Sequence, residues 1–371
     1  MKKILATVIA VLCVVSILTA CTPVEEYTGP WWYQEGANDQ HTGTIDTLDF
    51  DMPARVAWEY EIDSPISSDP VVVNGVVYFC GGDGVVYALK DKNGRKLWSY
   101  ETDAYIVSSP LYYDGYLYVT SYDANVYCFD AETGKIVWFE YIGEAMTASP
   151  IMTDKYLVIG TTQGKLIALN PESGAKVWTY STTGQIEHTP LYYEGNVYFG
   201  SDDLYFYCVN ARNGQKVWSF SLTNTMIQTA IGYNGKVYFG TGEDLFHCLD
   251  AYTGVKIWSF QTHNGWVGTR AAIKDGKIVF GSADYYLYCI DAESGDKIWE
   301  YKAGYWVMGA PSIVGNSVVF GCNNGYLYCV NFDDGEFRWS SMAKGKVSSG
   351  SAIVNGAVYY TDQGGFIRKL K

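Results

Sequence analysis

Residues 131–138 read AETGKIVW, and close variants of this octad recur along the chain as PESGAKVW (171–178), ARNGQKVW (211–218), AYTGVKIW (251–258) and AESGDKIW (292–299). Successive tryptophans at this place in the repeat are 40 residues apart, with one interval of 41. They are Trp58, Trp98, Trp138, Trp178, Trp218, Trp258, Trp299 and Trp339. A tryptophan that recurs at such a regular period predicts one repeat array, although a length of 371 residues alone would suggest two or three domains.

Each repeat predicts four short strands. In one copy they are residues 110–113, 116–120, 126–130 and 135–141, and Asp114-Gly115 is a hairpin turn signal between the first two. A glycine stands four residues before seven of the eight tryptophans, as Gly134 does before Trp138. A turn position that is always glycine indicates a positive φ, which other residues adopt only at a cost.

The two ends of the array complete each other. The last copy stops after its third strand, and the segment 54–62 around Trp58 has no third strand before it and carries Ala54 in place of the turn glycine. The sequence therefore predicts an all-β fold, an eight-bladed β-propeller of four-stranded antiparallel blades. An N-terminal strand closes it by pairing Trp58's strand with the strand of Phe366 and Ile367. A seven-bladed ring or an open solenoid is the alternative.

The N-terminus predicts export. Lys2 and Lys3 precede an apolar run over residues 4–20, and Leu18-Thr19-Ala20-Cys21 resembles a bacterial lipobox. We expect a signal peptide at 1–20, lipidation at Cys21 within a tether and leader at 21–50, and the propeller at 51–371. An uncleaved anchor helix is the alternative. Either way the body is expected outside the cytoplasm, on the outer membrane facing the periplasm in a two-membrane cell and otherwise on the cell surface.

Charge and cysteine placement narrow the function classes. The net charge of −14 argues against nucleic-acid binding, because an acidic surface repels phosphates. Five cysteines occupy one repeat slot, which Ala88 and Ala168 fill in other copies. They are Cys128, Cys208, Cys248, Cys289 and Cys329. A slot shared by Cys and Ala predicts small buried side chains and free thiols.

The octad with its final tryptophan resembles the docking motif of PQQ-type (quinoprotein-like) propeller repeats, over residues 51–371. The WD-repeat family has the same period but a Trp-Asp pair that this chain lacks. Residues 31–43, WWYQEGANDQHTG, resemble the leader that precedes such propellers. In size the chain is similar to the BamB-like family of lipid-anchored outer-membrane β-barrel assembly scaffolds.

Catalytic signatures are missing. PQQ-dependent dehydrogenases share the repeat, but that family has insertions between blades, a vicinal cysteine pair and an aspartate near calcium, and this chain has neither the insertions nor the cysteine pair. GxSxG, HExxH and GxxxxGK[ST] motifs are also absent. The resemblance thus implies the fold without the cofactor, and we expect no cofactor, no metal and no catalytic residue. Several repeats also have acidic residues in the second turn, between the second and third predicted strands. We interpret them as turn formers rather than calcium ligands; they are Asp83, Asp123, Asp202, Asp203, Asp244 and Asp284.

Candidate binding residues stand out where the repeat varies. The segment before each first strand, which faces the channel mouth in propellers, varies most, and its unusual residues fall on four consecutive blades. They are Glu187, His188, Gln228, Trp266, Arg270, Trp306 and Met308. Tryptophan and arginine dominate interface energetics, so these residues predict a recognition patch. The alternative is structural, with the tryptophans covering the blade tops and Arg270 paired with Glu187.

The predicted function is a non-catalytic, membrane-anchored binding scaffold, a monomeric propeller that engages another envelope protein. The BamB-like resemblance implies the β-barrel assembly machinery as partner, although the partner-binding loop motif of that family has no clear counterpart here. A surface receptor for glycan or peptide and a PQQ-dependent dehydrogenase are the alternatives.

Overall fold

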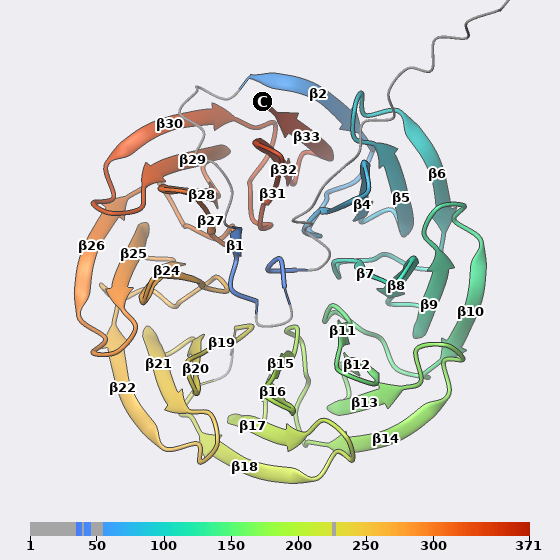
Figure 1. Ribbon diagram of the computed structural model, residues 1–371, viewed down its shortest axis with the longest axis horizontal. Coiled ribbons are helices and arrows are strands. Elements are labelled where there is room, and N and C mark those ends of the chain that lie inside the picture. Colours follow the sequence, from blue (N-terminus) through green and yellow to red (C-terminus); the bar gives the residue numbers. More distant parts are fainter. Residues whose placement is uncertain (1–34, 39–40, 46–54, 225–227) are drawn as a thin grey trace, which may run out of the picture.

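The computed structural model describes residues 35–38, 41–45, 55–224 and 228–371. They contain eight sheets, each built on four antiparallel strands, arranged as a closed ring (Figure 1). This confirms the predicted all-β, eight-bladed propeller. The predicted signal peptide, Cys21 and Ala54 lie outside the described residues. Within the described part of the chain, no helical segment has the length and hydropathy needed to cross a membrane.

The blades follow one another in chain order. Blades one to four are β3 (Val71–Val73), β4 (Val76–Cys80), β5 (Val85–Lys90), β6 (Lys96–Glu101); β7 (Leu111–Tyr113), β8 (Tyr116–Thr120), β9 (Asn125–Asp130), β10 (Ile136–Tyr141); β11 (Ile151–Met152), β12 (Leu157–Gly160), β13 (Lys165–Leu169), β14 (Lys176–Ser181); and β15 (Leu191–Tyr193), β16 (Asn196–Ser201), β17 (Tyr205–Asn210), β18 (Lys216–Ser221).

Blades five to eight repeat this arrangement until the chain ends. They are β19 (Ile231–Tyr233), β20 (Lys236–Gly240), β21 (Leu245–Asp250), β22 (Lys256–Gln261); β23 (Ala272–Lys274), β24 (Lys277–Gly281), β25 (Tyr286–Asp291), β26 (Lys297–Lys302); β27 (Ser312–Val314), β28 (Ser317–Cys322), β29 (Tyr326–Asn331), β30 (Phe337–Met342); and β31 (Ala352–Val354), β32 (Ala357–Thr361), β33 (Phe366–Leu370) with β2 (Val56–Glu61).

The octad docks each blade on the next. Trp98 Nε1 of β6 donates a hydrogen bond of 2.9 Å to the Ala131 carbonyl in the turn that precedes β10. The glycine of that turn, Gly134, has φ +69°, and a Cβ there would lie 2.5 Å from the Trp98 ring. Glycine is therefore required at this turn position for a second reason besides its positive φ. The indole of the preceding blade occupies the space that a side chain would need.

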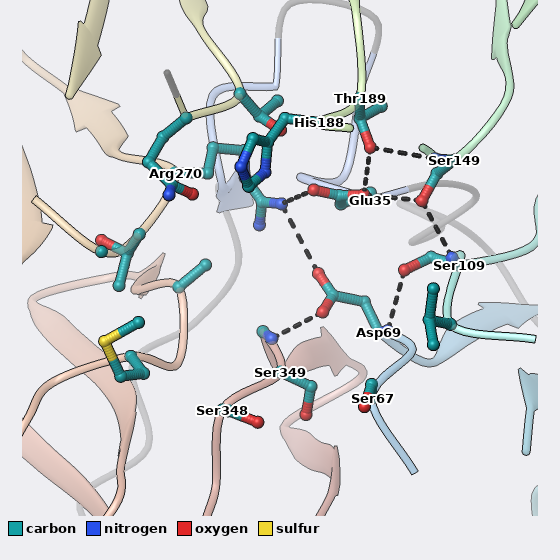
Figure 2. Close-up of a pocket in the computed structure, with 18 of the residues that line it drawn as sticks. Glu35, Ser67, Asp69, Ser109, Ser149, His188, Thr189, Arg270, Ser348 and Ser349 are labelled. Carbon is teal, nitrogen blue, oxygen red and sulfur yellow. Dashed lines mark hydrogen bonds and ion pairs between the residues drawn. The ribbon is translucent and has the colours of Figure 1, made fainter. Parts of the chain in front are cut away.

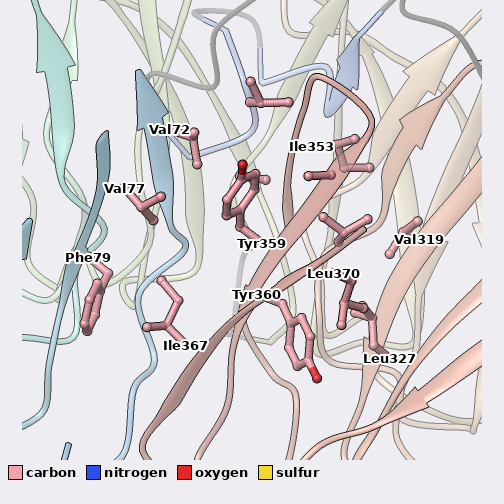
Figure 3. Close-up of a cluster of buried hydrophobic side chains, with 14 of the residues drawn as sticks. Val72, Val77, Phe79, Val319, Leu327, Ile353, Tyr359, Tyr360, Ile367 and Leu370 are labelled. Atoms are coloured by element: carbon pink, nitrogen blue, oxygen red, sulfur yellow. The ribbon is translucent and has the colours of Figure 1, made fainter. Parts of the chain in front are cut away.

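Strand β2 closes the ring as the outer strand of blade eight, antiparallel to β33 with Tyr60 opposite Ile367. Trp58 Nε1 donates to the Asp91 carbonyl of blade one at 2.7 Å. The core beneath this junction combines side chains of blades one, seven and eight, including Val77, Leu327 and Tyr360 (Figure 3). One strand from the start of the array thus joins its two ends.

The cysteine prediction is confirmed among the described residues, and the turn prediction is confirmed for four of the six aspartates, Asp83, Asp123, Asp203 and Asp284. All five slot cysteines are buried and free, and burial raises the pKa of the Cys128 thiol to about 12. Second-turn aspartates accept hydrogen bonds from neighbouring groups: Asp123 binds the Asn125 amide at 2.9 Å and the Tyr127 hydroxyl at 2.7 Å. These four carboxylates serve their turns, as expected.

Part of the leader lies inside the ring. Strand β1 (Thr44–Ile45) pairs in parallel with β27 and lies within the circle of blades (Figure 1). The Ile273 amide donates to the Thr42 carbonyl and the Ile313 amide to the Gly43 carbonyl, both at 2.8 Å. The described part of the segment predicted as a tether therefore adds a fifth strand to blade seven and carries Glu35 and His41 to the channel.

Candidate functional site

A polar well of about 180 Å³ occupies the channel, walled by the segments that lead into the first strand of each blade. Five of the seven predicted site residues line it, from blades four to seven: Glu187, His188, Gln228, Arg270 and Met308. Trp266 and Trp306 do not line the well. Their rings contact each other edge-on, with centroids 6.3 Å apart. The structure thus divides the residues of this segment between a well and an aromatic rim, and their role in binding stays a prediction.

One repeat slot forms a ring around the well. Its members, one per blade, are Asp69, Ser109, Ser149, Thr189, Thr229, Arg270, Ala310 and Gly350. The Asp69 amide donates to Ser109 Oγ at 2.9 Å and the Ser109 amide to Ser149 Oγ at 2.8 Å. The Ser149 amide continues the chain to Thr189 Oγ1 at 3.2 Å. Small hydroxyl side chains fit this slot because Ser109, Ser149 and Thr189 each accept a hydrogen bond from a backbone amide of the preceding blade.

Arg270 is the cation of this ring, and its side chain is only 2% exposed. Its Nη1 lies 3.1 Å from Glu35 Oε1 and 3.5 Å from Asp69 Oδ2 (Figure 2). The alternative interpretation, in which Arg270 pairs with Glu187, is wrong: its partners are Glu35 and Asp69. Asp69 is anchored in turn by the Gly350 amide, which donates to its Oδ1 at 2.6 Å.

Glu35 is the main feature that sequence reasoning missed. Besides Arg270, its carboxylate accepts hydrogen bonds of 2.8 Å from Ser149 Oγ and from Thr189 Oγ1 (Figure 2). Glu35 precedes the array and has no repeat counterpart, so comparing copies could not reveal it. Asp69 and Arg270 did share one signal, because a charge in a repeat slot that other copies fill with small or hydroxyl side chains requires a partner.

Burial and these partners set the protonation of the cluster. Burial alone would raise the pKa of Glu35, but Arg270, His41 and the two hydroxyls outweigh it and hold that pKa below its usual value. Burial raises the pKa of Asp69 to about 6, against the opposing pull of Arg270. Burial lowers the pKa of His41 to about 4. Near neutral pH the cluster therefore holds two carboxylates, one guanidinium and one neutral imidazole.

An acidic edge borders the well at blade four. Burial, then the nearby charge of Asp202, raises the pKa of Glu187, and burial lowers the pKa of His188. On the opposite side Met308 lies beside Gly268, where a Cβ would come within 2.5 Å of its sulfur. The wall of the well is thus mainly polar, and its charged side chains include Glu187, Asp69 and Arg270.

Exposed aromatic rings surround the mouth. Tyr285 stacks on Tyr305 with centroids 5.5 Å apart, and Tyr305 stacks on Trp306 at 5.3 Å. Across the ring, Tyr105 stacks on Tyr122 at 3.9 Å. Trp306 remains 37% exposed and lies two residues before Met308 of the well, so the rim and the well share one face. Stacked exposed rings of this kind favour partner contacts over internal packing.

The donor set does not fit a PQQ cofactor with calcium. Such a quinone carries several carboxylates, and among the described residues the sole lysine or arginine lining the well is Arg270, already bound to two carboxylates of the chain. In the described part of the chain, no group of three His, Cys, Asp or Glu side chains could hold a metal ion. A polyanion would therefore meet more negative than positive charge in the well.

Two family models match the chain. The model described as the β-propeller of beta-alanine-activating enzyme matches residues 112–367, and that of the outer membrane protein assembly factor BamB matches residues 51–120. A comparison with curated protein sequences finds no match.

Solved structures share the architecture at low identity. BamB from Moraxella catarrhalis is 16% identical, with a TM-score of 0.74 over 86% of this chain and 99% of that one. Quinohemoprotein alcohol dehydrogenase from Comamonas testosteroni is 14% identical, with a TM-score of 0.80 over 92% of this chain and 80% of that one. The computationally designed Ika8 protein is 16% identical, with a TM-score of 0.77 over 85% and 98%. The shared fold is a PQQ-like propeller resembling BamB, and it occurs in a dehydrogenase and in an assembly factor alike.

Proposed function

The chain belongs to the family described as the β-propeller of beta-alanine-activating enzyme, and from this premise we propose that it is a non-catalytic, extracytoplasmic scaffold held to a membrane through Cys21. Its partner would be another envelope protein, as the likeness to the assembly factor BamB suggests. The observation that carries the proposal is the exposed stack of Tyr285, Tyr305 and Trp306 beside the polar well.

A rigid ring suits this role because the rim residues lie in connections whose two ends are fixed by blade strands, β26 and β27 for Trp306 and β24 and β25 for Tyr285. Trp306 is positioned by the Asn323 amide, which donates to its carbonyl at 2.9 Å. Its indole contacts Trp266 of the neighbouring blade. A preformed aromatic patch loses little conformational entropy on binding, so a protein surface can gain affinity from it.

The test is photo-cross-linking in intact cells. A photoreactive phenylalanine at position 306 should capture a defined envelope protein, identified by mass spectrometry. The matched control is position 139, where Phe139 is exposed on the outer strand β10. The Trp306→Ala variant should lose at least about tenfold in partner recovery with an unchanged melting temperature, as removal of an interface hot spot does. Capture at both positions alike, or at neither, would contradict the proposal.

A glycan receptor is the second candidate, favoured by the same stacked rings, since aromatic faces pack on sugar rings. A glycan array probed with the wild type and with Trp306→Ala separates the two functions. A dehydrogenase would instead show a change in absorbance when quinone and calcium are added to the purified protein.

A further inference from the structure

We propose that the channel contains a carboxylate-binding site formed by Ser149, Thr189 and Arg270, and that the chain's own Glu35 occupies it as a tethered ligand. The three donors come from blades three, four and six, and all three converge on one carboxylate (Figure 2). A free small carboxylate, or a carboxylate displayed by a partner, is the class of ligand that this site takes.

The site is built by the blades and not by the leader. Ser149, Thr189 and Arg270 are members of the same ring slot, and their backbones are fixed at the entry to three separate sheets. Glu35 precedes the propeller and belongs to the leader, whose strand β1 pairs with β27. Removing Glu35 should therefore leave the donors in place, since Ser149 Oγ and Thr189 Oγ1 each still accept a hydrogen bond from a backbone amide of the preceding blade, and these two bonds do not involve Glu35.

Arg270 has donor capacity beyond its bond to Glu35. Within the part of the chain that the structure describes, its buried Nε and Nη2 find no hydrogen-bond partner, whereas its Nη1 contacts both Glu35 and Asp69. A guanidinium binds a carboxylate best with two parallel hydrogen bonds. Glu35 makes one, because its position is set by the leader, so an untethered carboxylate can engage the same cation more fully.

The tether explains why Glu35 holds the site in the resting protein. A carboxylate attached to the same molecule competes at an effective concentration of about millimolar or higher. A ligand must either exceed that concentration or also hold the leader away. The carboxylate site thus becomes accessible to a ligand only when Glu35 leaves it.

Chemical rescue tests the site on the full chain. Glu35→Ala should lower the melting temperature, and sodium acetate should restore at least half of the loss, whereas sodium chloride at equal ionic strength should not. In the Glu35→Ala, Thr189→Val double variant the rescue should disappear. The matched control is Glu59→Ala: Glu59 also pairs with a buried arginine, Arg368, at 3.1 Å, but on the outer surface with a side chain 48% exposed. Acetate should not restore that variant.

A second measurement uses the wild type and does not depend on the folding of a variant. Hydrogen exchange of residues 35–45 should increase in acetate and not in chloride, with the blades unchanged. Stabilisation of Glu35→Ala by both salts alike, or unchanged leader exchange together with no rescue, would overturn the proposal. If Glu35→Ala does not fold, unchanged wild-type exchange alone overturns it.

Discussion

The glycine of the octad is required at its position for two separate reasons. Gly134 needs its positive φ for the turn, and it must also lack a side chain because the Trp98 ring lies where a Cβ would be. The sequence revealed the first constraint through the invariant turn position. It could not reveal the second, because the indole belongs to a different repeat, and the contact exists only once the blades are adjacent.

Replacing Gly134 by Ala tests both constraints. We expect a loss of about 2–6 kcal/mol in the free energy of unfolding, since backbone strain and overpacking each cost about 1–3 kcal/mol. Gly115→Ala is the control, because Gly115 has φ +84° but a Cβ added there would meet nothing within 4 Å. That variant should lose only about 1 kcal/mol. Equal losses in urea denaturation would show that the indole contact is unimportant.

At the scale of elements, two N-terminal segments pair with two different blades. Strand β2 is the outer strand of blade eight, and β1 is an added inner strand of blade seven. The incomplete first and last copies predicted the role of β2, because a missing strand at one end must be supplied from the other. Nothing in the repeat predicted β1, whose two residues are too short to carry a periodic signal.

Deleting residues 51–62 should lower the melting temperature by roughly 10 °C or more, since several kcal/mol are lost with a strand and its buried side chains. Those side chains include Trp58 and Ile62. Deleting residues 22–40 removes Glu35 and its three contacts but no blade strand, so its effect should be smaller. Scanning calorimetry of both variants would contradict the closing role of β2 if the two losses were equal.

At the scale of the whole molecule, one charge network connects the leader to blades around the channel. Arg270 of blade six contacts Glu35 of the leader and Asp69 of blade one, and Glu35 contacts blades three and four. Buried charges persist only when they are paired, so the network makes the position of the leader depend on the closed ring.

The network also gives a pH dependence with opposed contributions. Asp69 has its pKa raised to about 6 from 3.8, so the stability it contributes is present below pH 3.8 and is lost as pH rises through about 6. His41 has its pKa lowered to about 4 from 6.5, so its contribution is present above pH 6.5 and is lost as pH falls toward 4. Between pH 4 and pH 6 the two trends offset each other.

The Asp69→Asn variant should show the pH dependence of stability that His41 contributes, because the opposing contribution of Asp69 is removed. The free energy of unfolding of this variant should rise with pH between 4 and 6 more steeply than that of the wild type, by up to about 1.4 kcal/mol per pH unit. Urea denaturation across this pH range measures the slope. His41→Phe should change the slope in the opposite direction, and parallel curves for all three proteins would exclude the network as its origin.

The sequence by itself determined the number of blades, the closure by Trp58's strand, the buried free cysteines and the segment that forms the channel wall. Each of these follows from periodicity, because a slot that every copy repeats has one physical role, and departures from it mark an end or a site. Only the tertiary structure decided that Arg270 pairs with Glu35 and Asp69, and that Trp266 and Trp306 form a rim instead of lining the well. Those contacts join residues up to 235 positions apart across the channel, where position in space rather than spacing in the chain selects the partner.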